Sequence, residues 1–478
     1  MDDALLKELR GIVGRDNVLA GTVDLQTYEY DAWGERSLPR AVVFLRSTAE
    51  AVSVVKTLGS GGVPFVPRGF GTGVSGGALA LSGAVVLELC RMNKILEVDV
   101  PNLCVVVQPG VFNWDVSLAL APYGYYYAPD PASLKASSIG GNIAENAGGP
   151  HCFKYGVTTN HVLGLELVLP DGEIVWVGGK NAECPGLDLT GVFVGSEGTL
   201  GIATAAILRI LKRPETIRTM LGVFASVEDA GGVVSAIVAA GLIPATLELM
   251  DRRTIGAVED ALACGYPRDA GAVLLIEVDG LKDGMDETVE QIAAICRENG
   301  ALEVRVAKDE AERANLWRGR QGTFPSITRL SPNYMSLDGT VPRTMLPETL
   351  RRVEAVAESY GLPVYSVLHA GDGNLHPCFL YDGTKPGEKE KAEAASMEVL
   401  RICAELGGTV SGEHGIGVEK LEAMPLVFSE NDLRAQRFVK DAFDPCGLCN
   451  PGKVLPDGAG APHGAAGGAR AGARVSDV

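Results

Sequence analysis

The sequence lacks an excess of positive charge. It contains 42 lysine and arginine residues against 60 aspartate and glutamate residues, which gives a net charge of −18. A surface this acidic repels phosphate backbones and anionic lipid. The composition therefore argues against a protein that binds nucleic acid. It also leads us to expect a local cationic group wherever an acidic substrate binds.

Long apolar runs are lacking as well. The charge-free run Ala230–Leu247 contains Gly231, Gly232, Gly241 and Pro244, which is typical of a buried helix followed by a strand. A spanning helix needs about 20 predominantly apolar residues, so we expect no membrane span. The first ten residues, MDDALLKELR, are charged and helix-like, unlike a signal peptide.

Closely spaced cysteines are few. The ten cysteines are scattered, and only Cys446 and Cys449 form a C-x-x-C pair. No second pair and no thioredoxin-like context accompany it, so we interpret both as incidental thiols. No iron–sulfur ligand set is apparent. Mostly free thiols are typical of a reducing cytoplasm, which is where we expect the protein.

The sequence is long and rich in glycine: it has 478 residues, of which 60 are glycine. A chain this long divides into two or three domains. Residues 1–213 predict a strand-rich α+β domain, and residues 214–456 predict an α/β domain in which strands alternate with helices around one sheet. Residues 457–478 are rich in glycine and alanine and lack apolar bulk, so we expect a disordered tail.

A glycine-rich loop at residues 67–77 reads PRGFGTGVSGG and contains the pattern G-x-G-x-x-G from Gly71 to Gly76. A dinucleotide-binding Rossmann loop must open a crossover helix, but only ALALSG separates Gly77 from the next strand. NAD is therefore disfavoured. The bare backbone N–H groups can still curl around a pyrophosphate. A plain flexible loop is the alternative.

Two further segments concentrate glycine, serine and asparagine. The first runs from Pro129 to Gly149 and the second from Gly195 to Gly201. In each of them the backbone can approach a flat or anionic ligand closely.

Three of the six histidines fall in two short motifs, HAGDGNLH (369–376) and SGEHGIG (411–417). A turn at residues 371–373 permits a hairpin that brings His369 and His376 to one point. Two histidines and a carboxylate, here Glu413, are a common open metal site. His414 points elsewhere and is a candidate base. The alternative is a set of separate structural histidines.

Together, in this order and spacing, the three glycine-rich segments resemble the FAD-binding half of the vanillyl-alcohol oxidase/PCMH flavoprotein superfamily. The two histidine motifs resemble the subgroup that oxidises D-2-hydroxy acids, which includes glycolate dehydrogenase FAD subunits, D-lactate dehydrogenases and D-2-hydroxyglutarate dehydrogenases. The resemblance covers the chain to about residue 456. It implies an α+β protein with a PCMH-type FAD-binding domain, an α/β cap domain and a short C-terminal helical segment that returns to the flavin.

The resemblance also implies roles for individual residues. FAD would be contacted by Pro67, Arg68, Gly69, Gly71, Thr72, Gly73, Ser75, Gly76, Gly77, Pro129, Asp130, Ser138, Gly140, Gly141, Asn142, Asn146, Gly148, Glu197, Gly198, Gly201, Ile202 and Asn450. Because residues 67–77 contain no histidine, we expect non-covalent FAD, and we interpret His151 as a polar packing residue.

The remaining implied roles concern catalysis. His369, His376 and Glu413 would hold a divalent metal such as Zn, Mn or Fe. His414 would remove the hydroxyl proton of the substrate, and Asn374 would reach toward substrate or flavin. In the stretch LWRGR, the family pattern L-W-x-x-R points to Arg320 as the group that binds the substrate carboxylate.

The implied reaction is the oxidation of a small 2-hydroxy acid by hydride transfer to FAD, with electrons passed on to another carrier. An iron–sulfur partner subunit, a homo- or hetero-oligomer, and contact with the membrane only through a partner follow from the resemblance alone. Relatives that take a five-carbon dicarboxylate carry a lysine where this chain has Met335 and Ser336, which favours glycolate or D-lactate. Arg343 keeps a longer acid open. An O₂-using oxidase, a metal-dependent hydrolase and a flavin-binding module without activity are the alternatives.

Overall fold

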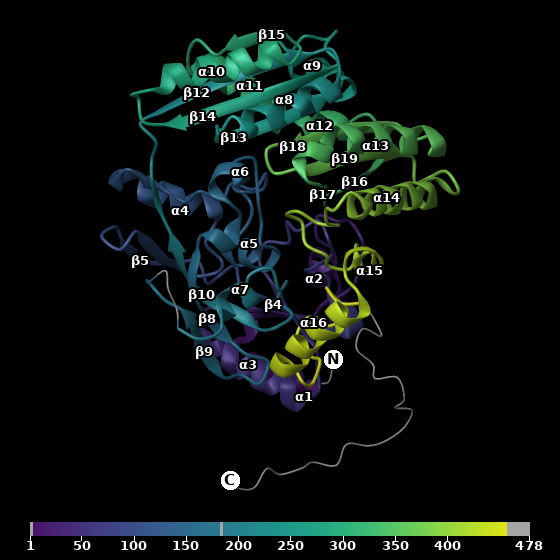
Figure 1. The fold of residues 1–478 in the computed structure, drawn as a ribbon. Helices are drawn as coiled ribbons and strands as arrows, with labels where there is room; N and C mark the ends of the chain where they lie inside the picture. The colour runs from purple at the N-terminus through teal and green to yellow at the C-terminus, as the bar shows by residue number, and fades with distance from the viewer. Residues whose placement is uncertain (1–2, 182–184, 457–478) are drawn as a thin grey trace.

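The computed structural model of the protein describes residues 3–181 and 185–456. The predicted disordered tail, 457–478, lies outside the described residues. The fold is of the predicted mixed α+β class, with three main sheets in sequence order (Figure 1). Among the described residues, no helix is long and apolar enough to cross a membrane.

The first sheet has four strands in the order β1 (Val18–Leu19), β2 (Ala41–Phe44), β4 (Val85–Glu88) and β3 (Phe65–Arg68). Helices α1 (Asp3–Val13) and α3 (Thr48–Ser60) pack against it through a common apolar core. Helix α3 is capped by Ser47, whose hydroxyl accepts the Glu50 N–H at 3.2 Å. The Glu50 carboxylate accepts the N–H of Arg46 at 2.8 Å.

Strands β3 and β4 are parallel neighbours. The residues between them contain a single 3₁₀ turn, Leu81–Gly83, and no α-helix. This confirms that the glycine loop of residues 67–77 does not open a Rossmann crossover.

The second sheet is antiparallel and has five strands. Their order is β5 (Ile95–Asp99), β6 (Cys104–Val107), β10 (Ile202–Arg209), β8 (Val162–Val168) and β9 (Ile174–Gly178). Short strands β7 (Tyr125–Tyr126) and β11 (Leu211–Lys212) pair beside it. The connections of this sheet carry helices α4 (Asn113–Leu120), α5 (Ile139–Glu145), α6 (Cys152–Tyr155) and α7 (Leu189–Phe193), whereas α2 (Thr22–Leu25) follows β1 of the first sheet.

The third sheet is antiparallel throughout. Its order is β15 (Ala301–Val306), β12 (Thr216–Phe224), β14 (Ala272–Gly280), β13 (Thr246–Asp251), β18 (Val364–His369), β19 (Asn374–Tyr381) and β16 (Asn333–Ser336), and β17 (Gly339–Thr340) also pairs with β19. Successive residues of a strand point to opposite faces, and both faces are buried by helices. One face packs against α8 (Val227–Ala239), α10 (Met285–Glu298), α13 (Leu346–Tyr360) and α14 (Glu388–Glu405). The other packs against α9 (Arg252–Leu262), α11 (Glu310–Gln321) and α12 (Thr323–Thr328).

The C-terminal part of the described chain returns to the first sheet. After α15 (Met424–Val427) and α16 (Glu430–Phe443), the chain runs beside β3, where the Phe65 N–H donates to Leu448 O and the Asn450 N–H donates to Phe65 O. Figure 1 shows α16 close to α1, far from the third sheet. The predicted returning helical segment is therefore present.

The cysteines in the described residues are free thiols. Cys446 is exposed, whereas Cys449 is buried and its thiol donates to Gly198 O at 3.1 Å. The C-x-x-C motif thus has its two thiols in different environments, in keeping with incidental packing.

Candidate active site

The three glycine-rich segments meet at one cleft of about 1370 Å³, its open mouth included. Its walls are the loop after β3, the start of α5 and the segment that precedes β10. At the start of α5, the Ser138 hydroxyl accepts the Gly141 N–H at 3.1 Å and so caps the helix. Glu413 and His414 lie in the wall of the same cleft.

Glycine is required at two points of this cleft for different reasons. A Cβ on Gly140 would lie 2.7 Å from the Pro109 Cβ, so the backbone packs too closely for any side chain. Gly71 has a φ of +66°, a left-handed conformation that other residues adopt at a cost. The close backbone that results can present N–H groups to a ligand.

Most of the residues predicted to contact FAD line this cleft. They are Pro67, Arg68, Gly69, Gly71, Thr72, Gly73, Gly77, Ser138, Gly140, Gly141, Asn142, Gly148, Glu197, Gly198 and Gly201. The Nδ2 of Asn142 is buried and has no hydrogen-bond partner among the described residues. A buried amide donor without a partner is costly, and a glycine-walled cleft with a free donor fits a dinucleotide such as FAD.

The other predicted FAD residues lie outside the lining, and each has a structural partner. Ser75 O accepts the N–H groups of Val418 and Glu419, and Gly76 packs beneath the Trp33 ring. Ile202, the first residue of β10, is buried in the apolar core that packs against the first sheet. Asn450 donates to Gly77 O at 3.0 Å and to Glu197 O at 2.7 Å, so it holds the cleft walls together.

Three more of these residues also lie away from the cleft. Pro129 O accepts the Asn113 amide, and Asn146 ends α5 and accepts the Thr159 N–H. Asp130 pairs with His151 at 2.6 Å. These three shape the segment from Pro129 to Gly149 without facing the cleft.

His151 joins the two halves of the chain. Its Nε2 lies 3.4 Å from Glu277 Oε1 on β14, and its ring stacks on Trp317 of α11 with a centroid separation of 5.7 Å. Glu277 also accepts the Trp317 indole N–H at 2.7 Å. His151 is therefore a packing residue in this structure, but one at an interface between the second and third sheets.

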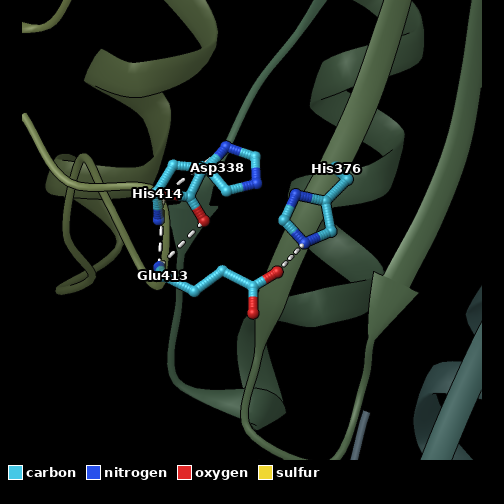
Figure 2. Close-up of side chains that lie close together, drawn as sticks. All are labelled: Asp338, His376, Glu413 and His414. Carbon is cyan, nitrogen blue, oxygen red and sulfur yellow. Dashed lines mark hydrogen bonds and ion pairs between the residues drawn. The ribbon is translucent and has the colours of Figure 1, made fainter. Parts of the chain in front are cut away.

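The predicted hairpin is formed by β18 and β19, with His369 opposite Asn374 and Val367 opposite His376. Cross-strand partners share a face of the sheet, so His369, Asn374 and His376 point to one side. The Nε2 atoms of His369 and His376 lie 3.3 Å and 3.0 Å from the same oxygen, Glu413 Oε1. Figure 2 shows the Glu413 carboxylate turned toward His376.

The hydrogen bonds of the two imidazoles indicate what this point can hold. His376 Nδ1 lies 2.9 Å from the carbonyl oxygen of Leu337, and His369 Nδ1 lies 2.8 Å from Glu248 Oε1. Both partners only accept, so both Nδ1 atoms carry the proton. In the neutral form that a metal ligand requires, the two rings would direct two Nε2 lone pairs toward the position of one carboxylate oxygen. This donor set fits a divalent cation of the Zn, Mn or Fe type.

The charges around His369 and His376 also favour a bound cation. Burial opposes protonation of His369, but the carboxylates of Glu248 and Glu413 outweigh it and raise its pKa well above the usual range. Burial opposes ionisation of Glu413, but His369 and His376 outweigh it and hold its pKa well below the usual range. The point between them attracts positive charge.

Asp338 was not among the predicted site residues, and it holds the loop that carries Glu413 and His414. Its carboxylate accepts the backbone N–H groups of Gly412, Glu413 and His414, as well as the side chains of Asn374, Ser411 and Lys420. Figure 2 shows two of these backbone bonds. Asp338, His376, Glu413 and His414 also lie close enough to hold an ion, with donor atoms within 4.8 Å of one another. Since the Asp338 oxygens are already occupied, His369 is the better third ligand.

His414 stacks on His376 with a centroid separation of 5.0 Å and an interplanar angle of 18°. Its Nδ1 lies 4.0 Å from Asp338 Oδ2. Burial lowers the pKa of His414 to about 4 against the opposing charge of Asp338. The ring is therefore neutral near pH 7 and able to accept a proton.

Arg320, on α11, ends beside the same histidines. Its Nη2 lies 2.5 Å from Glu248 Oε2, and its buried Nε has no hydrogen-bond partner among the described residues. Glu248, which sequence reasoning missed, thus bridges Arg320 and His369. Arg343 is placed differently, since its Nε donates to Gly371 O and its guanidinium lies over the Phe153 ring. It supports the hairpin turn.

Comparison with known proteins identifies the two parts of the chain. Residues 39–178 match the family "FAD binding domain", and residues 213–454 match "FAD linked oxidases, C-terminal domain". The chain is 43% identical over 454 residues to "Glycolate oxidase subunit GlcD" of Escherichia coli K12, covering 95% of this chain and 91% of that protein. It is 33% identical over 428 residues to "D-lactate dehydrogenase" of Anaerostipes hadrus, covering 88% and 90%.

Solved structures give the same fold at low sequence identity. The structure of p-cresol methylhydroxylase with substrate bound superposes with a TM-score of 0.80 at 17% identity, over 96% of both chains. The 4-ethylphenol oxidase of Gulosibacter chungangensis superposes with a TM-score of 0.79 at 20% identity, over 95% of this chain and 97% of that one. The chain belongs to the FAD-linked oxidases of the vanillyl-alcohol oxidase/PCMH type.

Proposed function

We propose that this protein oxidises a small 2-hydroxy acid, glycolate or D-lactate, to the 2-oxo acid. The observation that carries the proposal is that Glu413 and His414 line the glycine-walled cleft. A candidate base and a candidate metal ligand thus open onto the cleft that fits FAD.

Three residues of the site have proposed roles in this reaction. His414 takes the hydroxyl proton, because it is neutral near pH 7 and faces the cleft. Arg320 pairs with the substrate carboxylate through its unpartnered Nε. Asn374 donates to Asp338 at 3.1 Å and keeps a buried, unpartnered Oδ1, which can accept a hydrogen bond from substrate or flavin.

Two groups complete the site when bound. FAD, held non-covalently, supplies the acceptor for the substrate hydride. A divalent cation held by His369, His376 and Glu413 supplies positive charge that lowers the pKa of the substrate hydroxyl.

Glycolate is supported by the 43% and 41% identity to glycolate oxidase subunits of Escherichia coli and Bacillus subtilis. D-Lactate is supported by the more distant D-lactate dehydrogenases. A five-carbon dicarboxylate needs a second cation, and Met335 and Ser336 offer none. Arg343 uses its Nε for the hairpin turn, so a longer acid would have to bind its Nη atoms.

We further propose that the electrons leave to a partner protein, an iron–sulfur subunit, as part of a hetero-oligomer in the cytoplasm. The relatives named as oxidase subunits support this assembly. Contact with the membrane would then be made by the partner.

The test is an anaerobic visible spectrum of the purified protein before and after addition of glycolate or D-lactate. We expect a flavin spectrum that bleaches with one of the two acids. His414→Ala should keep the flavin spectrum and lose bleaching. A colourless protein that cannot be reconstituted with FAD would favour the metal-hydrolase alternative, and a flavin that neither acid bleaches in the metal-loaded protein would refute the substrate class.

A further inference from the structure

Glu145 is an acid in the wall of a cleft that has to receive an anionic dinucleotide. It ends α5 and lines the cleft beside the glycine loop of residues 67–77. A Cβ placed on Gly73 would lie 3.5 Å from Glu145 Oε1, and one on Gly77 would lie 2.6 Å from it. Its other oxygen, Oε2, is buried and has no hydrogen-bond partner among the described residues.

Glu197 approaches the same point from the opposite wall. Its carboxylate accepts the N–H groups of Ile416 at 2.6 Å and Gly417 at 2.7 Å. Both Glu145 Oε2 and Glu197 Oε1 lie within 3 Å of the position that a Cβ on Gly415 would take. Two carboxyl groups therefore converge on the loop that carries Glu413 and His414.

The charges around the pair do not balance if both acids are ionised. The groups that act on Glu145 are the acids Glu197 and Asp31 and the cations Lys420 and Lys453. Lys420 is already paired with Asp338 at 3.2 Å, and Lys453 donates to Gly77 O, Leu79 O and Asn450 Oδ1. Burial and the Glu197 carboxylate raise the pKa of Glu145 well above its usual range.

We propose that Glu145 holds a proton whenever FAD occupies the cleft and that it shares this proton with Glu197. The dinucleotide then binds beside a neutral acid, and Glu197 keeps the negative charge that holds the N–H groups of Ile416 and Gly417. Glu145 is a positioning residue, because it acts through Glu197 on the loop that carries Glu413 and His414. The inference rests on FAD being the ligand of the cleft.

The proposal predicts a specific pH dependence of FAD binding. Above the pKa of Glu145 in the FAD-free protein, FAD binding must take up a proton, so the dissociation constant rises about tenfold per pH unit. In Glu145→Gln the amide is neutral at every pH, so this part of the pH dependence disappears. Lys453, whose pKa burial lowers to about 8, contributes to both proteins and cancels in the comparison.

The experiment measures FAD affinity by flavin fluorescence between about pH 6 and pH 9 for wild type, Glu145→Gln and Asp31→Asn. Asp31 belongs to the same buried group of charges but does not line the cleft, so Asp31→Asn is the matched control. It should keep the rise of about tenfold per pH unit, with an onset at lower pH because one negative charge that raises the pKa of Glu145 is removed. Infrared spectra of the FAD-bound proteins should show the C=O stretch of a carboxylic acid that shifts in D₂O and is missing in Glu145→Gln.

The outcomes separate this inference from the proposed function. If wild type binds FAD but Glu145→Gln keeps the same pH dependence and the same carboxylic acid band, Glu145 is ionised in the complex and the inference fails. If wild type binds no FAD at any pH, the proposed function itself fails. We expect Glu145→Gln to bind FAD within about threefold of wild type near pH 7, because the amide matches the neutral acid in shape.

Discussion

Replacing Asp338 with asparagine should separate cofactor binding from substrate oxidation. Asp338 is fully buried, and its carboxylate binds three consecutive backbone N–H groups of the loop that carries Glu413 and His414. Burial opposes ionisation of Asp338, but His414 and Lys420 outweigh it and hold its pKa well below the usual range. Asparagine has the same shape but lacks the charge and one acceptor oxygen.

The expected loss of stability in Asp338→Asn follows from the effect on Lys420, the buried lysine that pairs with Asp338. Lys420 is 1% exposed and lies 3.2 Å from Asp338 Oδ2 and 3.7 Å from Glu419 Oε2, so the substitution leaves a buried ammonium without the nearer of its two counter-charges. Breaking a buried pair in this way costs about 3–5 kcal/mol. For a unit of 150–250 residues, each kcal/mol shifts the melting temperature by about 2–4 °C, so we expect the part of the chain after β11 to melt roughly 10 °C lower.

The assay follows melting and flavin chemistry in the same preparation. Most of the cleft wall is built by the loop after β3, by α5 and by the segment before β10, and only Glu413 and His414 come from the loop that Asp338 binds, so Asp338→Asn should retain FAD. The rate of anaerobic flavin reduction by substrate should fall at least a hundredfold, because a displacement of about 1 Å of a catalytic group costs that much. Lys420→Met combined with Asp338→Asn should recover part of the stability but not the rate. A single variant that melts and reduces its flavin like wild type would refute the role of Asp338 as anchor of the loop.

Three further predictions address other contacts of the site. Glu248→Gln should lower metal affinity about 10- to 100-fold, because His369 loses its carboxylate partner. Metal analysis after dialysis should show a lower metal content than in wild type, with the FAD content unchanged. Equal metal content in the two proteins would contradict this role of Glu248. Treatment with a chelator should abolish substrate-driven bleaching while the flavin spectrum persists, and added divalent metal should restore bleaching; full activity in a metal-free preparation would remove the metal from the site. Burial opposes ionisation of Glu277, but hydrogen bonds from His151 and Arg313 outweigh it and lower its pKa from 4.5 to about 2. The ionised Glu277 therefore adds about 3 kcal/mol to the free energy of unfolding above pH 4.5. This stabilisation is lost as the pH falls toward 2. The stability difference between wild type and Glu277→Gln should therefore shrink across that range in denaturant titrations, and a constant difference would contradict the assignment.

The parts of the site that could be predicted from the sequence are those whose residues lie together in short motifs. The hairpin of residues 369–376 has its turn glycines and both histidines within eight residues, so the convergence of the imidazoles follows from local geometry. The glycine-rich segments are similarly local. Their composition shows where backbone can approach a ligand closely, although it cannot show which residues face inward, as Ser75 and Ile202 demonstrate.

The parts that could not be predicted depend on contacts between distant residues. Asp338 lies more than 70 residues before the loop that it binds, and Glu248 lies 121 residues before His369. Each is a single acid in or beside a strand, a pattern with no local signature.

The loop of residues 411–417 is bound from two sides, and this arrangement has a consequence for how the site forms. Asp338, from the third sheet, accepts the N–H groups of Gly412, Glu413 and His414. Glu197, from the wall of the cleft, accepts those of Ile416 and Gly417. Because the backbone is held at both ends by buried carboxylates from different halves of the chain, the positions of Glu413 and His414 depend on how the halves are docked. The ion pairs and stacking of His151 with Asp130, Glu277 and Trp317 hold the two halves in this arrangement. Substitutions at this interface should therefore impair substrate oxidation, although they change neither the cleft lining nor His369, His376 and His414.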